Sequence, residues 1–431
     1  MSSAETRSKH KQHMFPAVAN YYEEPLVLRE GKGRYVKDAD GREYLDFFAG
    51  ILTTSVGHAH PTVNAAIHAQ VDKLLHTSTL YPTEPMVEFA EALLKKMPKH
   101  LTKAFFTASG TEADETAAMM AMVSTGRSEL IALRHGYSGR SALAQSLMGH
   151  ANYRALPTQI AGIKHAMTPY CYRCPMGLSY PSCEVKCAQD LEELIRTTTT
   201  GQIAGMLAEP IQGVGGFITP PKEYFQTAIA IIRKYGGVFI ADEVQTGFGR
   251  TGGKMWGFEQ YGIEPDIVSM AKGIANGMPL AATVTTDAIA ATLKHGSIST
   301  FGGNPVSCAA ATAVITVIDN EQLCDNAEAR GKELRGGLLE LKNKYAIIGD
   351  VRGMGLMQAL ELVVDEPKRD RTPNPQATVR LFEETRKRGL LIGKGGLYGN
   401  TVRIAPPLNV TAGEVADALR KLDESFAALS K

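Results

Sequence analysis

Residues 236–250, GGVFIADEVQTGFGR, and residues 267–280, IVSMAKGIANGMPL, contain the pattern that decides the fold. Each stretch has an apolar run typical of a buried strand, and a functional group ends or follows that run: Asp242 in the first and Lys272 in the second. The thirty positions between these side chains match one strand-helix-strand unit. Both groups are therefore predicted at the same edge of a mostly parallel sheet.

A lysine amine that faces a buried carboxylate suits a pyridoxal phosphate site. The amine can form an imine with the cofactor aldehyde, and the carboxylate can hold the ring nitrogen in its protonated form. Asp242 follows the apolar residues 238–241, where a carboxylate is costly to bury without a cation or several donors. Taken singly, Asp242 could cap a turn and Lys272 could be a solvated loop residue, so the assignment depends on their combination.

The sequence on either side of these stretches extends the sheet. From about residue 103 to 290, apolar runs alternate with helical stretches, which predicts an α/β sheet with helices on both faces. The runs are KAFFTAS (103–109), ELIALRH (129–135), AGMLAEP (204–210), GVFIADE (237–243), DIVSMA (266–271) and PLAATVTT (279–286).

The two ends of the chain predict a smaller α+β domain. Residues 31–50 have the pattern of a hairpin with Asp40 and Gly41 in its turn. Helical periodicity predicts helices at 62–76, at 84–97, from about 306 and from about 412. Strand patterns predict two pairs of strands, at 344–362 and 390–408. We expect three parts: residues 1–60 joining the small domain, 61–315 as the large cofactor domain, and 316–431 as the small domain.

Composition restricts the kind of partner. The 431 residues include 44% hydrophobic and 21% charged residues, and the formal net charge is +1, so nothing favours nucleic acid or a membrane surface. Small, neutral or zwitterionic substrates fit better. The first fifteen residues hold no apolar run and include Glu5, which predicts neither a secretory signal nor a membrane helix and favours the cytoplasm.

Four cysteines crowd into CYRCPMGLSYPSCEVKC (171–187): Cys171, Cys174, Cys183 and Cys187. Two close pairs of thiols can in principle bind zinc, but the gap between the pairs is short for a zinc ribbon. We interpret them chiefly as reduced thiols in a surface loop and expect no metal in the site, with zinc and disulfide as the alternatives.

A phosphate site is predicted in FFTASGTEADETAAMM (105–120), where a strand breaks at Ser109, Gly110 and Thr111 and a helix begins. Free backbone N–H groups and the positive end of the helix dipole converge at such a point. An ordinary helix cap is the simpler alternative for this motif alone. Val244 and Gln245, just after Asp242, are placed to press on the ring face and to reach its phenolate oxygen.

Seven motifs occur in an order that resembles the class III (ω-type, subgroup II) aminotransferases of pyridoxal phosphate fold type I. They are SGTEA (109–113), YSG (137–139), AEPIQG (208–213), ADEVQTGFGR (241–250), MAKGIANGMP (270–279), STFGGNP (299–305) and VRIAPPL (402–408). The cysteine loop is most similar to the branch with alanine-glyoxylate aminotransferase 2 and related phospholyases. The resemblance implies a mostly parallel seven-stranded sheet between helices in the large domain, with a smaller α+β domain.

The resemblance also implies roles for single residues around the cofactor. Lys272 would form the imine and shuttle the proton, Asp242 would pair with the ring nitrogen, and Gln245 would donate to the phenolate oxygen. Tyr137 would stack on the ring, although Ser138 stands where the family usually has histidine. Gly110 and Thr111 would bind the phosphate. Thr300 would reach the phosphate of a neighbouring subunit, which implies a homodimer, or a tetramer of dimers, with the site at the subunit interface.

Two further positions match substrate-binding residues of the family. Arg403 would clamp the substrate carboxylate, a role suited to the two-pronged guanidinium. Glu209 would pair with this arginine and mask its charge, so that one pocket takes α-amino acids in one half-reaction and ω-amines in the other. The simpler alternatives are a strand-surface arginine and a helix-cap acid.

The leading hypothesis is ping-pong transamination, with an amino acid or ω-amine as donor and pyruvate, glyoxylate or 2-oxoglutarate as acceptor. Racemases, epimerases and phospholyases of the same fold share the cofactor contacts and stay open as alternatives. A nicotinamide-dependent oxidoreductase is disfavoured because no GxGxxG opens the first strand-helix unit. A cofactor-binding protein without catalysis is disfavoured by Lys272, Asp242 and Arg403 together. The identity of the substrate stays open.

Overall fold

The computed structural model describes residues 1–157 and 159–429. Within this part of the chain, seven strands form one sheet in the order β4-β10-β9-β8-β7-β5-β6. The strands β5 to β9 pair in parallel, and β10 runs antiparallel to both of its neighbours. The mostly parallel sheet predicted from the sequence is confirmed. Its strands are β4 (Lys103–Thr107), β5 (Leu130–Leu133), β6 (Ile163–Ala166), β7 (Gly205–Ala208), β8 (Val238–Asp242), β9 (Ile267–Met270) and β10 (Ala281–Thr285).

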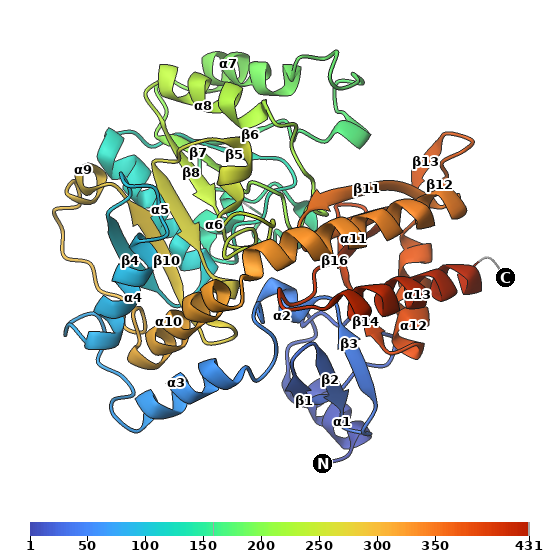
Figure 1. Cartoon of the computed structure of the whole chain (residues 1–431). Coiled ribbons are helices and arrows are strands. Elements are labelled where there is room, and N and C mark those ends of the chain that lie inside the picture. Colours follow the sequence, from blue (N-terminus) through green and yellow to red (C-terminus); the bar gives the residue numbers. More distant parts are fainter. Residues whose placement is uncertain (158, 430–431) are drawn as a thin grey trace.

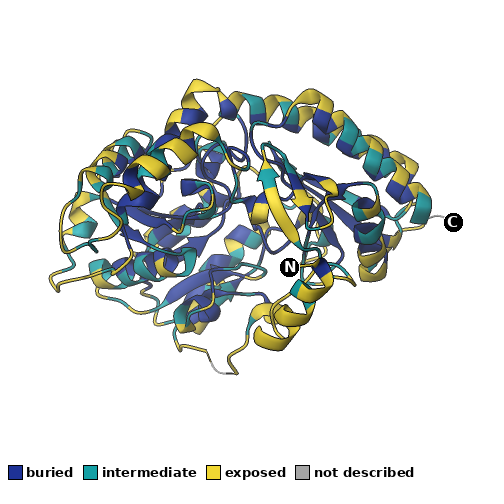
Figure 2. Cartoon of the chain, turned by 90° about the horizontal axis from the view of Figure 1, so that it is seen from below, coloured by how far each residue is buried: buried dark blue, intermediate teal, exposed yellow. Residues whose placement is uncertain are grey.

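The central strands are buried from end to end, as expected of a sheet covered on both faces. Every residue of β5, β7, β9 and β10 is buried. Figure 2 shows these strands dark blue beneath helices whose outer faces are yellow. The helices of this part of the chain are α3 (Pro61–Val71), α4 (Glu84–Leu94), α5 (Gly110–Thr125), α6 (Ala142–Leu147), α7 (Lys186–Thr198), α8 (Tyr224–Lys234), α9 (Asp287–Ala290) and α10 (Pro305–Asn320).

The C-terminal part forms a second sheet flanked by long helices (Figure 1). Its strands run in the order β11-β12-β16-β15, and β13 pairs with β12. These strands are β11 (Ile348–Met354), β12 (Met357–Asp365), β13 (Asp370–Pro373), β15 (Gly393–Gly395) and β16 (Thr401–Ile404). The helices are α11 (Leu323–Lys344), α12 (Pro375–Lys387) and α13 (Ala412–Leu429).

The N-terminal hairpin joins this C-terminal part by strand pairing. Its strands are β1 (Leu28–Lys32), β2 (Tyr35–Asp38) and β3 (Glu43–Asp46), followed by the short helix α2 (Ala49–Leu52). Strand β3 pairs in parallel with β14 (Leu390–Leu391), and the four strands form one sheet. The hairpin predicted with Asp40 and Gly41 in its turn is present. Segments about 340 residues apart in the sequence thus lie side by side.

Several elements have no counterpart in the sequence prediction, and strand β6, helix α1 (Ser3–His13) and helix α12 are three of them. Strand β6 has only four residues, and two of them, Lys164 and His165, are polar, so no apolar run marks it. Helix α1 is polar around its whole circumference, and its capping serine, Ser2, is its clearest signal. Helix α12 lies between two segments that are recognised by their strand patterns.

Candidate active site

A cavity of about 470 Å³ lies where strands β7, β8 and β9 end and helix α5 begins. Parallel sheets present their ligand sites at this edge. Most of the residues singled out in the sequence line the cavity: Ser109, Gly110, Thr111, Tyr137, Glu209, Asp242, Val244, Gln245 and Lys272. The described lining does not include Arg403 or Thr300.

Lys272 follows strand β9 in a strained conformation. Its φ is 48°, in the left-handed region that a residue with a side chain rarely adopts. Such strain concentrates at functional sites, where the surroundings enforce it. Among the described residues, no hydrogen bond or ion pair holds the Lys272 amine in place, and burial lowers its pKa against the opposing effect of Asp242 and Glu209. A lowered pKa makes the free amine, which is the nucleophilic form, easier to reach.

Asp242 ends strand β8 and is 2% exposed. Burial raises the pKa of its carboxyl to about 6, while the backbone N–H of Val244 and the charge of Lys272 act in the opposite direction. The Val244 N–H donates to Oδ1 over 3.0 Å. Near neutral pH this carboxyl is therefore mainly ionised and buried, with the Lys272 side chain and the open cavity beside it.

The start of helix α5 forms an anion cradle. The first N–H groups of a helix have no partner inside it, and the Ser109 side chain does not cap them because its hydroxyl donates to Glu112 over 2.9 Å. The Thr111 hydroxyl is also engaged, since it accepts from the backbone N–H groups of Arg140 and Ser141. Backbone N–H groups, rather than hydroxyls, are thus left for a phosphate.

Close packing around the cradle explains two of its glycines. A Cβ on Gly139 would lie 2.3 Å from the Thr111 Oγ1, and the φ of Gly139 is 131°. A Cβ on Gly110 would lie 3.2 Å from the Val244 Cγ1. The loop of residues 138–141 therefore closes tightly over the helix start, and Tyr137 is fixed at its edge by a bond from its N–H to Glu209, 3.0 Å long.

Glu209 and Arg403 do not form an ion pair in the described structure; instead both bind the backbone of Gly213. Glu209 accepts from the Gly213 N–H over 2.6 Å, and the Arg403 Nη1 donates to the Gly213 carbonyl over 3.3 Å. Burial, followed by the charge of Asp242, raises the pKa of Glu209 to about 8. A largely protonated Glu209 has no charge with which to neutralise an arginine.

The Arg403 guanidinium lies between two aromatic rings. Its central carbon is 4.8 Å from the Phe48 ring centre and 5.5 Å from that of Phe217, and its Nε donates to the Lys394 carbonyl over 2.9 Å. Stacked rings and a carbonyl fix a guanidinium plane without neutralising it. Strand β16 thus holds a rigid cation close to the loop that carries Glu209.

Thr300 lies on the surface, away from the cavity of its own chain. It lines a separate surface hollow with residues 297–301 and the outer face of helix α5. Exposed apolar side chains occur on its own segment and on residues 75–81: Ile298, Phe301, Leu75, Leu80 and Tyr81 are each more than 60% exposed. The two segments that carry them are joined by bonds between Thr79 and Ser299.

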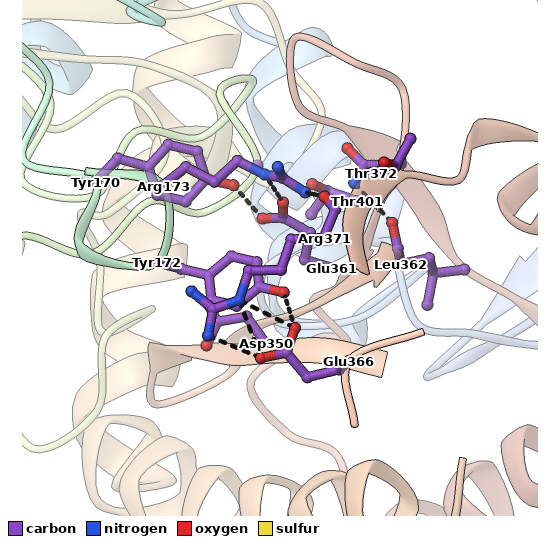
Figure 3. A network of polar contacts seen from close by, with 12 residues as sticks. Tyr170, Tyr172, Arg173, Asp350, Glu361, Leu362, Glu366, Arg371, Thr372 and Thr401 are labelled. Carbon is purple, nitrogen blue, oxygen red and sulfur yellow. Dashed lines mark hydrogen bonds and ion pairs between the residues drawn. The ribbon is translucent and has the colours of Figure 1, made fainter. Parts of the chain in front are cut away.

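The cysteine loop lies on the surface, with residues 175–182 exposed, and its first residues are tied to the C-terminal sheet (Figure 3). Tyr170 and Arg173 both bind the buried Glu361 of β12, and Tyr172 donates to Glu366 over 2.5 Å. The four cysteines are free thiols. Burial and the neighbouring thiols raise the pKa of Cys171 and Cys187 to about 11, which keeps them in the unreactive protonated form. Among the described residues, no three His, Cys, Asp or Glu side chains are placed to hold a metal ion.

Sequence reasoning missed three residues of the site. Asp114 lines the cavity and is 1% exposed, while Phe48 and Phe217 enclose Arg403. A signal for Asp114 was available, because it lies four positions after Gly110 and so on the same helix face. Phe48 comes two residues after strand β3 and Phe217 follows the turn of residues 213–216, and no periodic pattern predicts where either ring points.

The residues fit pyridoxal phosphate. The cavity offers an amine, an opposing carboxylate and a helix start that lacks a capping side chain. The Gln245 side-chain oxygen is buried and has no hydrogen-bond partner among the described residues, as expected of an amide that meets a polar ligand.

Among the described residues, no helix combines the length and apolar character needed to span a membrane.

Comparison with known proteins gives the same answer. The family model for aminotransferase class III matches residues 17–426. The chain is 44% identical over 420 residues to alanine-glyoxylate aminotransferase 2 homolog 2, mitochondrial, of Arabidopsis thaliana, covering 97% of this chain and 86% of the plant protein. A thermostable (S)-enantioselective ω-transaminase from Thermomicrobium roseum superposes with a TM-score of 0.92 at 32% identity over the whole of both chains.

A second solved structure, an amine transaminase from an uncultivated Pseudomonas species in its pyridoxal-phosphate-bound form, superposes with a TM-score of 0.89 at 35% identity. It covers 96% of this chain and 98% of its own. Fold, cavity and relatives agree on the cofactor and on the transfer of amino groups. The chain therefore belongs to the class III aminotransferases, the pyridoxal-phosphate-dependent enzymes of fold type I.

Proposed function

We propose that Lys272 binds the cofactor covalently and that Asp242 holds its ring nitrogen. One observation carries this proposal: Lys272 has a strained backbone, its amine has no partner among the described residues, and it lines the same cavity as Asp242. In the same proposal, the backbone of Ser109, Gly110 and Thr111 binds the phosphate. Tyr137 and Val244 enclose the ring, and Gln245 donates to its phenolate oxygen.

The chemistry of the reaction is divided between the cofactor and the chain. When bound, pyridoxal phosphate supplies an electron sink that makes the Cα–H bond of an amino substrate acidic. The Lys272 Nζ would take that proton and then give it to a carbon atom of the bound cofactor, a task that its lowered pKa favours because the free amine becomes easier to reach. Ionised Asp242 would favour positive charge on the ring nitrogen, and the closed loop of residues 138–141 would help to hold the phosphate.

Borohydride reduction tests the assignment of Lys272 directly. The reduced, digested protein is expected to show the mass of the pyridoxyl phosphate group on the peptide that contains Lys272. That mass on another lysine peptide, or on none, contradicts the proposal. The variant Asp242→Asn serves as the matched control for the second role, because it preserves volume while removing the charge. It is expected to keep the covalent attachment and to lose turnover.

For the substrate, we propose that Arg403 binds a carboxylate, from an α-amino acid donor and from a keto acid such as pyruvate, glyoxylate or 2-oxoglutarate. Its plane is fixed by Phe48 and Phe217, and it carries no counter-charge from Glu209. For carboxylate-free ω-amines, the proposal is that Glu209 turns from Gly213 to Arg403. Product analysis distinguishes transamination from racemisation or elimination: a keto product must appear, and only when an acceptor completes the cycle.

We propose a homodimer in which Thr300 completes the phosphate site of the partner. Support comes from the exposed apolar patch around Thr300, which is larger than single surface residues explain. Light scattering tests the dimer. Mixing the variants Thr300→Ala and Lys272→Ala tests the shared site, since a mixed dimer has one site with both native residues. Recovered activity on mixing is expected, and its absence contradicts the shared site.

The compartment and the domain division are also proposals. We propose the cytoplasm, whereas the plant relative is named a mitochondrial protein. Cell fractionation distinguishes the two. We likewise propose that residues 1–60 move with 316–431 and that 61–315 form the cofactor domain, in agreement with the pairing of β3 with β14. Limited proteolysis that separates residues 1–60 from the C-terminal part would contradict this division.

A further inference from the structure

A second buried aspartate lies beside Asp242. Asp114 is on helix α5, is 1% exposed and lines the same cavity. None of the roles proposed above involves it. A buried carboxyl that touches a reactive site needs a physical explanation, because a charge in such a place is costly unless it is paired.

The contacts of Asp114 form a chain that ends on Asp242. The hydroxyl of Ser269 donates to the Asp114 Oδ1 over 2.5 Å. Ser269 belongs to β9 and is the register partner of Asp242 on β8, so the serine holds Asp114 against the neighbouring strand. The carboxyl groups of Asp114 and Asp242 line the same cavity, close enough that a hydrogen bond between them would lower the pKa of Asp242. Two carboxylates cannot make that bond, since neither has a proton to donate.

The charges around the cavity show why a proton must be retained. The titratable groups that face Asp114 are Asp242 on β8, Glu209 after β7 and Lys272 after β9. With every group ionised, three carboxylates would face a single ammonium in a buried space. Carboxyls that share a site in this way do not all ionise. Glu209 is already largely protonated, so the remaining question is which of the two aspartates keeps a proton. Asp242 accepts from the Val244 backbone N–H, whereas Asp114 accepts, among the described residues, from the Ser269 hydroxyl alone and is the less compensated of the two.

We propose that Asp114 is a positioning residue that stays protonated and donates its proton in a hydrogen bond to Asp242. The hydrogen bonds then run in one direction, from Ser269 to Asp114 and from Asp114 to Asp242. This arrangement leaves Asp242 ionised, with its free lone pairs directed to whatever cation enters the cavity. The proposal rests on the proposed role of Asp242 toward the ring nitrogen and explains how that residue keeps its charge while buried.

The electrostatics of the pair agree with this direction. Burial, and next the charge of Asp242, raise the pKa of Asp114 well above its ordinary value. The pKa of Asp242 is raised less, to about 6, and the bond from Asp114 is one of the effects that lower it. Sharing one proton between two close carboxyls separates their titrations in this way.

Infrared spectroscopy of the cofactor-free protein tests the proton itself. The carbonyl stretch of a protonated carboxylic acid is separate from that of a carboxylate, and Glu209→Gln removes the contribution of Glu209. Burial also raises the pKa of Glu243 to about 7, so Glu243 contributes to this spectral region in every variant. At neutral pH, adding Asp114→Asn to the Glu209→Gln protein is expected to remove band intensity equal to one protonated carboxyl. Glu115→Gln, a change at the neighbouring helix acid, is the control and should leave the intensity unchanged. A spectrum that Asp114→Asn does not change overturns the proposal.

Cofactor affinity tests the donor. Asparagine can accept from Ser269 and donate to Asp242, so Asp114→Asn is expected to bind pyridoxal phosphate within about threefold of the native protein. Asp114→Leu has a similar volume but no donor, and it should lose about tenfold, the effect of one hydrogen bond. Equal losses in both variants would mean that the charge of Asp114 matters, and no loss in either would mean that it positions nothing. Thermal unfolding of the cofactor-free variants confirms that each one folds. The infrared result does not depend on catalysis, so it separates failure of this inference from failure of the Lys272 assignment.

Discussion

The proposed carboxylate clamp can be tested by replacing Arg403 with lysine. Three features hold the guanidinium in place: the Phe48 ring at 4.8 Å, the Phe217 ring at 5.5 Å and the Lys394 carbonyl, 2.9 Å from Nε. A lysine has one nitrogen and no planar face. It cannot bond to that carbonyl and bind a substrate carboxylate through two parallel bonds at the same time.

The size of the effect follows from the contacts that are lost. One charge-assisted hydrogen bond to the substrate contributes about 1.5–3 kcal/mol, and the weakened stacking contributes about 1 kcal/mol more. The sum, about 2.5–4 kcal/mol, corresponds to a loss on the order of 10² to 10³ in the rate constant for a carboxylate donor. A primary amine without a carboxylate makes neither contact and should react within about threefold of the native rate.

The assay follows the donor half-reaction alone, because the keto acceptor also carries a carboxylate. Cofactor-loaded enzyme is mixed with alanine or with isopropylamine, and the change in cofactor absorbance gives a second-order rate constant for each donor. Thermal unfolding of Arg403→Lys serves as the control for misfolding, since the residue is buried. If alanine and isopropylamine lose rate equally, or if alanine loses none, Arg403 does not bind the carboxylate and the reasoning is refuted.

Three further predictions follow from the site. Lys272→Ala should lower turnover on the order of 10³-fold or more while the protein still binds the cofactor, measured by steady-state kinetics and equilibrium dialysis. Glu209→Gln should flatten the pH dependence of unfolding: the raised pKa of Glu209, about 8, gives stability that is complete below its ordinary value of 4.5 and is lost as pH rises through 8. Urea midpoints of the cofactor-free protein between pH 5 and 9 measure this slope, and a native slope in the variant contradicts the role of Glu209. Gly139→Ala should destabilise the protein by about 1–3 kcal/mol, because its Cβ would collide with Thr111 at a φ of 131°. Urea unfolding measures the loss, and a variant as stable as the native protein would show that the loop relaxes freely.

The sequence predicts the central sheet well because its strands are buried on both faces. Runs such as IVSMA and VFIAD are mostly apolar, and a buried strand can be predicted from them without knowing which strands pair with it. Strand β6 is stabilised instead by pairing with β5, and two of its residues are polar, so it has no signal of its own. The same reason explains β14, which has two residues and exists because it pairs with β3.

The residues of the site also fall into two groups, those that the sequence predicts and those that it does not. Lys272, Asp242 and the start of helix α5 could be predicted because each follows the end of a recognisable strand. The proximity of Asp114 to Asp242 could not, since it depends on how helix α5 is rotated against β8 and β9. The absence of a Glu209–Arg403 ion pair in the described structure is equally invisible in sequence, because the backbone of Gly213 competes for both side chains.

The reactive amine and the proposed carboxylate holder belong to different sheets. Lys272 follows β9 of the large sheet, whereas Arg403 lies on β16 of the C-terminal sheet. If both proposed roles hold, a donor bound at its two ends reaches from one sheet to the other, and the separation of the two sheets limits the length of the donor. Replacements far from the cavity that shift one sheet against the other would then change which amino acids fit without altering any group that touches them.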